Sequence, residues 1–103
     1  MSQPTPIPLN DANMLRIIRE LAQEPANVFV KKHARMRMKE RSITLAQVVT
    51  CLRRGSIDEH AHESTGGDWR CTLRYQQAGD LVRVAAAIEK DESGQWIAVV
   101  TVF

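Results

Sequence analysis

The chain has 103 residues, of which 44% are hydrophobic and 25% are charged, and its formal net charge is +2. These values are typical of one globular domain with a single core, and the charge is weaker than that of a dedicated nucleic-acid-binding protein. The two cysteines, Cys51 and Cys71, are too few for a disulfide framework or a zinc site. No apolar run is long enough for a membrane span and no signal peptide opens the chain, which predicts a cytoplasmic protein without membrane contacts.

Residues 1–9 are predicted to form a proline-rich arm, and residues 10–103 a single domain. Three prolines alternate in the arm, which excludes a helix there and favours an extended segment. Asn10 or Asp11 can cap the helix that follows, and Pro25 ends it. Its apolar stripe has the i, i+3, i+4, i+7 spacing of an amphipathic helix and consists of Met14, Ile17, Ile18 and Leu21.

A short strand and two further helices are predicted next. Residues 27–31 are the strand candidate, and a cationic helix runs from about residue 33 to residue 41. Thr44 opens the third helix, with Gln47 in the position that completes a capping box. Gly55 is a natural residue to follow the end of that helix.

From Ser56 onward, the hydrophobic period changes from that of a helix to that of a strand. The patterns predict strands over 57–63, 69–76, 82–88 and 96–103. The fold class is therefore α+β, with two or three N-terminal helices packed on an antiparallel β-sheet. The residues expected to be mostly buried are Leu45, Val48, Cys51, Leu52, Leu73, Val84 and Val100.

The cationic helix is the most informative segment. Residues 31–54 contain eight lysines and arginines and one acidic residue, Glu40. Positions four apart share a helix face, so His33, Arg37 and Arg41 form one rib. An imidazole beside guanidinium groups can grip a phosphate and move a proton near it, although an ordinary solvated basic helix has the same pattern.

Two motifs carry a family resemblance, which covers roughly residues 27–103. They are His33-Ala-x-x-x-Met38-x-x-Arg41-x-Ile43 and the terminal Val99-Val100-Thr101-Val102-Phe103. The chain resembles a family of small bacterial domains of unknown function that begin with a His-Ala…Met…Arg-x-Ile signature and end with Ile-Val-Thr-Val-Tyr. Ser42 stands where that family usually has glycine, and Phe103 where tyrosine is common. The family is similar in fold to the RelE/ParE-like toxins.

The resemblance implies a toxin-like, metal-independent RNA endonuclease of a toxin–antitoxin system, or a non-enzymatic relative that contacts protein or nucleic acid. RNA or the ribosome and a cognate antitoxin are the implied partners, and no cofactor is expected. Such cleavage needs a proton acceptor, a proton donor and cations at the phosphate. His33 is the candidate acid or base, since histidine is the residue type that most readily exchanges a proton near working pH. Arg37 and Arg41 are the candidate phosphate clamps.

Further cations are candidates for RNA binding. Arg70 and Arg74 share one face of their strand, and Arg83 can meet them on the next strand if the register permits. Arg35 and Lys39 extend the cationic helix. Whether the helix and sheet cations converge on one surface decides whether a site exists.

Each candidate has a structural alternative. His33 can brace the junction between strand and helix, and the helix arginines can pair with Glu40, Asp58 or Glu59. The sheet arginines can simply keep an open face soluble. A polar cluster that resembles a metal site would be split between two faces of a strand, so no metal is expected there. The cluster is Glu59, His60, His62 and Glu63, and the aromatics expected in the core are Trp69, Tyr75 and Trp96.

Overall fold

Helices and strands follow one another along residues 9–103, which are the residues that this computed structural model describes. In chain order they are α1 (Asp11–Ala22), the 3-10 helix η1 (Pro25–Asn27), β1 (Val28–Val30), α2 (Lys32–Arg41), α3 (Leu45–Arg54), β2 (Ser56–Glu63), β3 (Trp69–Gln77), β4 (Asp80–Asp91) and β5 (Gly94–Val102). The predicted arm lies outside the described residues except for Leu9, which is half-buried against the core.

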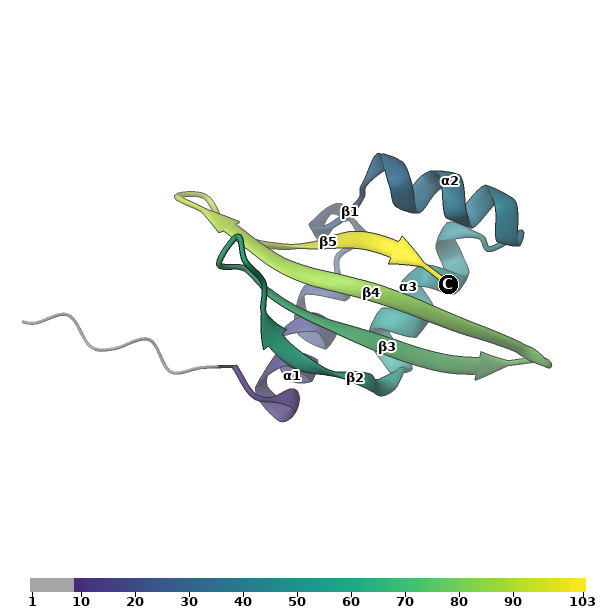
Figure 1. The fold of residues 1–103 in the computed structure, drawn as a ribbon, viewed down its shortest axis with the longest axis horizontal. Coiled ribbons are helices and arrows are strands. Elements are labelled where there is room, and N and C mark those ends of the chain that lie inside the picture. The colour runs from purple at the N-terminus through teal and green to yellow at the C-terminus, as the bar shows by residue number, and fades with distance from the viewer. Residues whose placement is uncertain (1–8) are drawn as a thin grey trace, which may run out of the picture.

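The strands form one sheet in the order β1-β5-β4-β3-β2. Strands β2 to β5 are the predicted antiparallel meander, whereas β1 pairs with β5 in parallel, with Val28 opposite Ile97. The α+β class is confirmed, but the sheet is mixed because the short run before the cationic helix joins it as an edge strand. Helices α1 and α3 cover one face of the sheet, and α2 lies along its β1–β5 side (Figure 1).

Local signals set the ends of α1 and the start of α3. The side chain of Asn10 caps α1 by accepting a 2.8 Å hydrogen bond from the backbone N–H of Asn13. Pro25 follows α1 and begins η1. Thr44 and Gln47 form the predicted capping box at the start of α3. These contacts satisfy backbone groups that a helix end would otherwise leave unpaired.

Gly55 ends α3 for a different reason from the one predicted. Its φ of −71° and ψ of 165° are extended rather than left-handed, so other residues could adopt the same backbone. A Cβ at Gly55 would lie 2.5 Å from the carbonyl oxygen of Cys51 and 2.8 Å from that of Arg74. Glycine is therefore required by two carbonyl groups, one from the last turns of α3 itself and one from β3, and no local pattern reveals the second.

The core lies between α1, α3 and the facing side of the sheet. Five of the residues predicted to be buried are fully so: Val48, Cys51, Leu52, Leu73 and Val84. Burial raises the pKa of the Cys51 and Cys71 thiols to about 12, so both are small apolar groups. The prediction for Leu45 is wrong, because this residue is 53% exposed. It lies in the first turn of α3, and the residues that α3 buries are in its later turns.

A β-bulge in β5 explains why Val100 is only half-buried. Strand β4 pairs with Val99 and Thr101 but has no partner for Val100. The inserted residue shifts the alternation of the strand by one. Ile97 and Val99 face the core before the bulge, and Val102 faces it after the bulge.

A carboxylate at the start of α1 clamps this helix to β2. Asp11 accepts a 2.7 Å hydrogen bond from the backbone N–H of Ala61 and a 2.6 Å hydrogen bond from Nδ1 of His60. The bond from Ala61, and then that from His60, lowers the pKa of Asp11, while the bond to Asp11 raises the pKa of His60. The polar cluster of β2 therefore supplies a structural contact. Residues 9–103 hold no group of three or more side chains that could bind a metal ion.

We expect the stability of the protein to fall as the pH rises above 6.5, and to fall less in His60→Gln. The raised pKa means that the contribution of His60 is complete below 6.5 and is lost as the pH passes the higher pKa of the folded state. Asp11 acts in the opposite direction, and its contribution is lost as the pH falls below 3.8. Thermal unfolding on both sides of pH 6.5 measures the effect. His62→Gln is the control, and identical pH profiles for His60→Gln and wild type would contradict the clamp.

Candidate nucleic-acid interface

Helix α2 exposes most of its surface. Only Ala34 is buried, and Met38 is half-buried against the core. Because α2 is a continuous helix, His33, Arg37 and Arg41 lie on successive turns of one rib. His33 is exposed, as an acid or base that meets a large substrate must be.

A second group of cations lies on another side of α2. Arg35 is roughly 160° around the helix axis from His33, and Lys32 and Lys39 are within roughly 60° of Arg35. We call Lys32, Arg35 and Lys39 the α2 cationic flank. Nε of Arg35 donates a 3.2 Å hydrogen bond to the carbonyl oxygen of Val30, so this flank adjoins β1. The predicted RNA-binding residues of α2 therefore face a different direction from the predicted catalytic rib.

Most α2 cations have no counter-charge. Arg37 pairs with Glu40 at 3.3 Å, which is one of the alternatives that the sequence left open. Among residues 9–103, no partner forms a hydrogen bond or ion pair with the side chain of His33 or of any α2 cation apart from Arg35 and Arg37. The helix thus presents uncompensated positive charge to solvent.

The sheet arginines lie on the face that the helices leave open. Arg74 of β3 is directly opposite Arg83 of β4, so the register brings these two together. Like charges at such positions destabilise a sheet. Asp58 of β2 compensates them, because its carboxylate accepts hydrogen bonds of 2.6 and 3.0 Å from Arg83 and lies 3.9 Å from Arg74. Asp58 therefore pairs with the sheet arginines and not with the α2 arginines.

Arg70 lies apart from this pair. It is roughly 13 Å along β3 from Arg74, and its Nε donates a 2.9 Å hydrogen bond to Asp68. Helix α2 packs mainly on β5, whereas the sheet arginines lie on β3 and β4 and point to the face that the helices leave open. The predicted site residues consequently form separate groups, namely the two sides of α2, the Arg74–Arg83 pair and Arg70.

An exposed aromatic pair also lies on the open face. Phe29 of β1 is 57% exposed, and its ring meets that of Trp96 edge to face, with the centroids 6.1 Å apart. The pair borders a hollow of about 490 Å³ whose floor includes Ala98. The prediction that Trp96 anchors the core is therefore wrong. Ile97 and Val99 face the core, so the alternation of β5 turns Trp96 and Ala98 to the other side.

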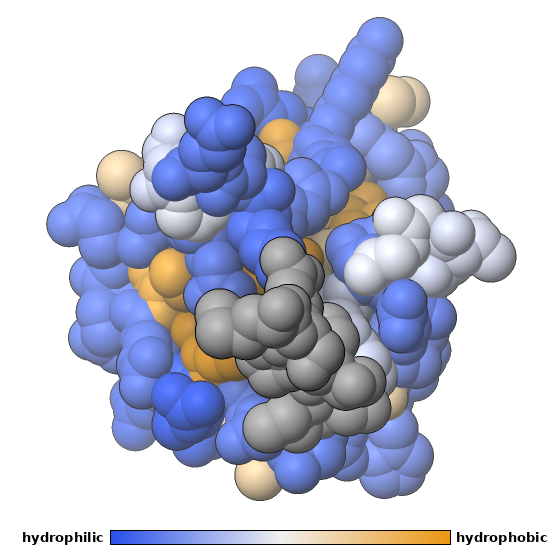
Figure 2. All heavy atoms as spheres, turned by 90° about the vertical axis from the view of Figure 1, so that its left-hand side faces the viewer, coloured by the Kyte–Doolittle hydropathy of each residue, from blue (hydrophilic) through white to orange (hydrophobic). Residues whose placement is uncertain are grey.

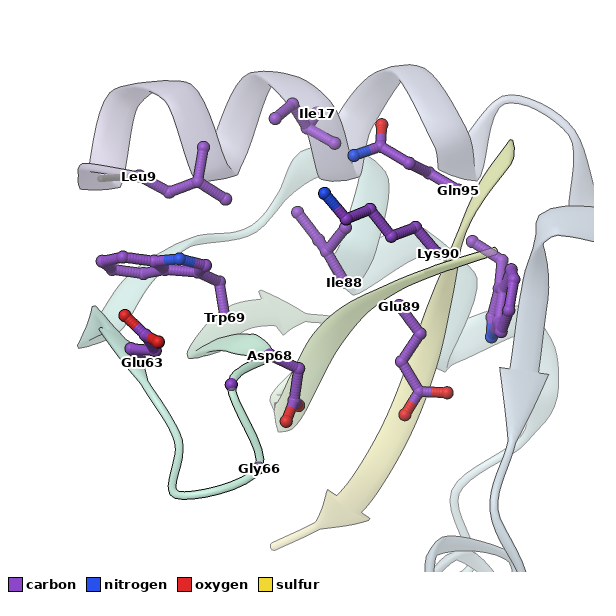
Figure 3. Close-up of a pocket in the computed structure, with 12 residues that line it drawn as sticks. Leu9, Ile17, Glu63, Gly66, Asp68, Trp69, Ile88, Glu89, Lys90 and Gln95 are labelled. Carbon is purple, nitrogen blue, oxygen red and sulfur yellow. The ribbon is translucent and has the colours of Figure 1, made fainter. Parts of the chain in front are cut away.

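A second hollow, of about 850 Å³, lies at one end of the sheet (Figure 3). Leu9 and Ile17 form its roof, and Trp69 and Ile88 lie below them. Figure 2 looks onto this end of the molecule and shows apolar surface between hydrophilic side chains. Among the described residues, Lys90 is the only cation that lines this hollow, and no residue of α2 does so. This hollow is therefore separate from the α2 cationic flank.

A known protein family matches the larger part of the chain. Residues 30–103 match the family model described as Domain of unknown function (DUF4258). The chain belongs to this family. No curated protein and no solved structure matches it.

The DUF4258 match covers α2, α3 and strands β2 to β5, whereas α1 precedes it. The cations of α2 and the sheet arginines therefore belong to the DUF4258 domain, and Phe29 lies one residue outside it. Within residues 9–103, the DUF4258 chain has no helix that is long and apolar enough to cross a membrane.

Proposed function

We propose that this DUF4258 protein is a RelE/ParE-like RNA-binding module whose main phosphate-binding surface is the α2 cationic flank. The observation that carries the proposal is charge compensation. All three sheet arginines pair with aspartates, whereas Lys32 and Lys39 are exposed and have no partner among residues 9–103. Uncompensated cations along one side of a helix suit a row of backbone phosphates.

The similarity to RelE/ParE-like proteins is part of this proposal. It is supported by the order of the elements, in which helices precede an antiparallel meander and pack on one face of the sheet. That similarity favours cytoplasmic RNA or the ribosome as the target and an antitoxin as the protein partner. Fold alone does not decide function, so the proposal depends on the charges of α2.

We expect Lys32→Gln/Lys39→Gln to weaken binding to a short single-stranded RNA and to flatten its salt dependence. The slope of log K against log salt concentration should decrease by about 1.4, since each phosphate contact to a single strand contributes about 0.7. Fluorescence anisotropy over a salt series measures the slope. Arg16→Gln/Lys90→Gln is the matched control, because it removes the same charge from exposed positions on α1 and β4. Equal slopes for the two double variants would contradict a specific role for α2.

A second candidate function is metal-independent cleavage of RNA, with His33 as the acid or base and Arg37 and Arg41 as phosphate clamps. The observation that favours it is the continuity of α2, which places the three side chains on one rib with the imidazole exposed. A phosphate held at Arg37 would lie about one helical turn from His33. This hypothesis departs from the condition stated for the sequence, since it assigns cleavage to α2 alone, apart from the sheet arginines.

A further inference from the structure

We propose that the hollow beside Phe29 and Trp96 receives an unpaired base of single-stranded RNA. This inference rests on the proposed RNA-binding function and adds the part of the ligand that is recognised. Phe29 is 57% exposed and its ring lies against that of Trp96, so the two form an apolar patch rather than a single scattered side chain. In an edge-to-face pair, the ring that presents its edge keeps both of its own faces free of its partner, so a flat base can stack there.

The size and lining of the hollow suit a base. Its volume of about 490 Å³ lies within the roughly 300–1,000 Å³ of small-molecule sites. The rings of Phe29 and Trp96 supply the apolar surface, since Ala98 is fully buried. Amide and carboxylate groups surround the rings, namely those of Asn27, Glu89, Asp91 and Gln95. These groups can donate to or accept from the edge of a base while its flat surface stacks on a ring.

The hollow adjoins the start of α2, where the α2 cationic flank begins. Lys31 lines the hollow, pairs with Glu89 at 3.0 Å and is the N-cap residue of α2, next to Lys32. The hydrogen bond from Arg35 to Val30 joins the flank to the strand that carries Phe29. A nucleotide could therefore place its base in the hollow and its phosphate on the flank.

This proximity favours RNA over a protein as the occupant. The exposed apolar surface of the hollow is formed by two rings, which is a small patch, whereas a specific protein–protein interface usually buries more than about 1,000 Å². Aromatic rings beside cations are the usual means of holding a single strand, since every base has a flat face.

The test uses Trp69→Phe protein, in which Trp96 is the only tryptophan. We expect a single-stranded decaadenylate to quench the fluorescence of Trp96, and a duplex RNA of the same length to bind more weakly without quenching it. Phe29→Ala in this background should weaken binding of the single strand by roughly 5- to 150-fold while leaving the salt slope unchanged, because stacking is lost and phosphate contacts are retained.

Two further variants separate stacking from folding. Phe29→Tyr keeps a flat ring and should retain affinity. Leu81→Ala removes another exposed apolar side chain, 43% exposed and on the same open face, and should change nothing. A loss of affinity that is shared by Phe29→Tyr or Leu81→Ala would overturn the proposal.

The outcomes distinguish this inference from the proposed function. If wild-type protein binds single-stranded and duplex RNA equally, without quenching and without an effect of Phe29→Ala, the base site is wrong and phosphate binding by α2 stands. If wild-type protein binds neither RNA at low salt, both proposals fail and a protein partner becomes the occupant to seek.

Discussion

Replacing His33 by alanine is expected to lower RNA cleavage by a factor of about 10² to 10⁴ while RNA association stays within about twofold of wild type. A group that transfers a proton in the transition state affects the rate by this amount, whereas RNA association is assigned to the lysines and arginines of α2. His33 is exposed and has no hydrogen-bond partner among residues 9–103, so its truncation breaks no hydrogen bond of the fold. Gel analysis of a labelled single-stranded RNA, with and without a chelator, measures cleavage.

The control for this experiment is His62→Ala, which removes an exposed imidazole from β2 and should leave cleavage unchanged. Inducible expression in bacteria gives a second readout, since wild-type protein should arrest growth and degrade RNA and the His33 variant should not. Cleavage that persists in His33→Ala, or that requires a divalent metal, would contradict the proposed chemistry. If wild-type protein binds RNA without cutting it, the binding-module function remains.

The sequence predicted the features of this chain that depend on neighbouring residues. The helical rib of α2 follows from a spacing of four residues, and the capping box at Thr44 and Gln47 depends on a spacing of three. The alternation of β3 likewise predicted that Arg70 and Arg74 would lie opposite the core-facing Leu73. In each case the interaction range is shorter than one element, so the local pattern contains the answer.

The features that depend on pairing between distant segments could not be predicted in this way. Asp58 compensates Arg74 and Arg83 only because β2, β3 and β4 adopt one particular register. At Gly55, one of the two carbonyl groups that leave no room for a Cβ belongs to Arg74 of β3. Because apolar residues occupy both faces of β5, its sequence has no alternation from which to orient Trp96. The hollow beside Phe29 and Trp96 was therefore not predicted, although it depends only on which alternate residues of β5 face the core.

Leu52→Ala is expected to destabilise the protein by roughly 2–5 kcal/mol. Leu52 is 0% exposed and lies in the last turns of α3, which packs on β3 and β4. Truncation removes buried methyl groups and leaves a cavity, and both effects lower the free energy of unfolding. Leu45 offers a matched control on the same helix, because it is 53% exposed. Leu45→Ala should change the free energy of unfolding by about 0.5 kcal/mol or less.

Urea unfolding followed by circular dichroism measures both variants against wild type. A lower midpoint with an unchanged m-value in Leu52→Ala would show that stability has changed and that the surface exposed on unfolding has not. Equal effects of the two substitutions would mean that the helix as a whole, and not its sheet-facing side, carries the stabilisation. The comparison also bears on the site, since α3 packs on β3 and β4, the strands that hold Arg74 opposite Arg83. A core that loosens in Leu52→Ala should therefore weaken the ion pairs of Asp58, while the exposed cations of α2 keep their affinity for RNA.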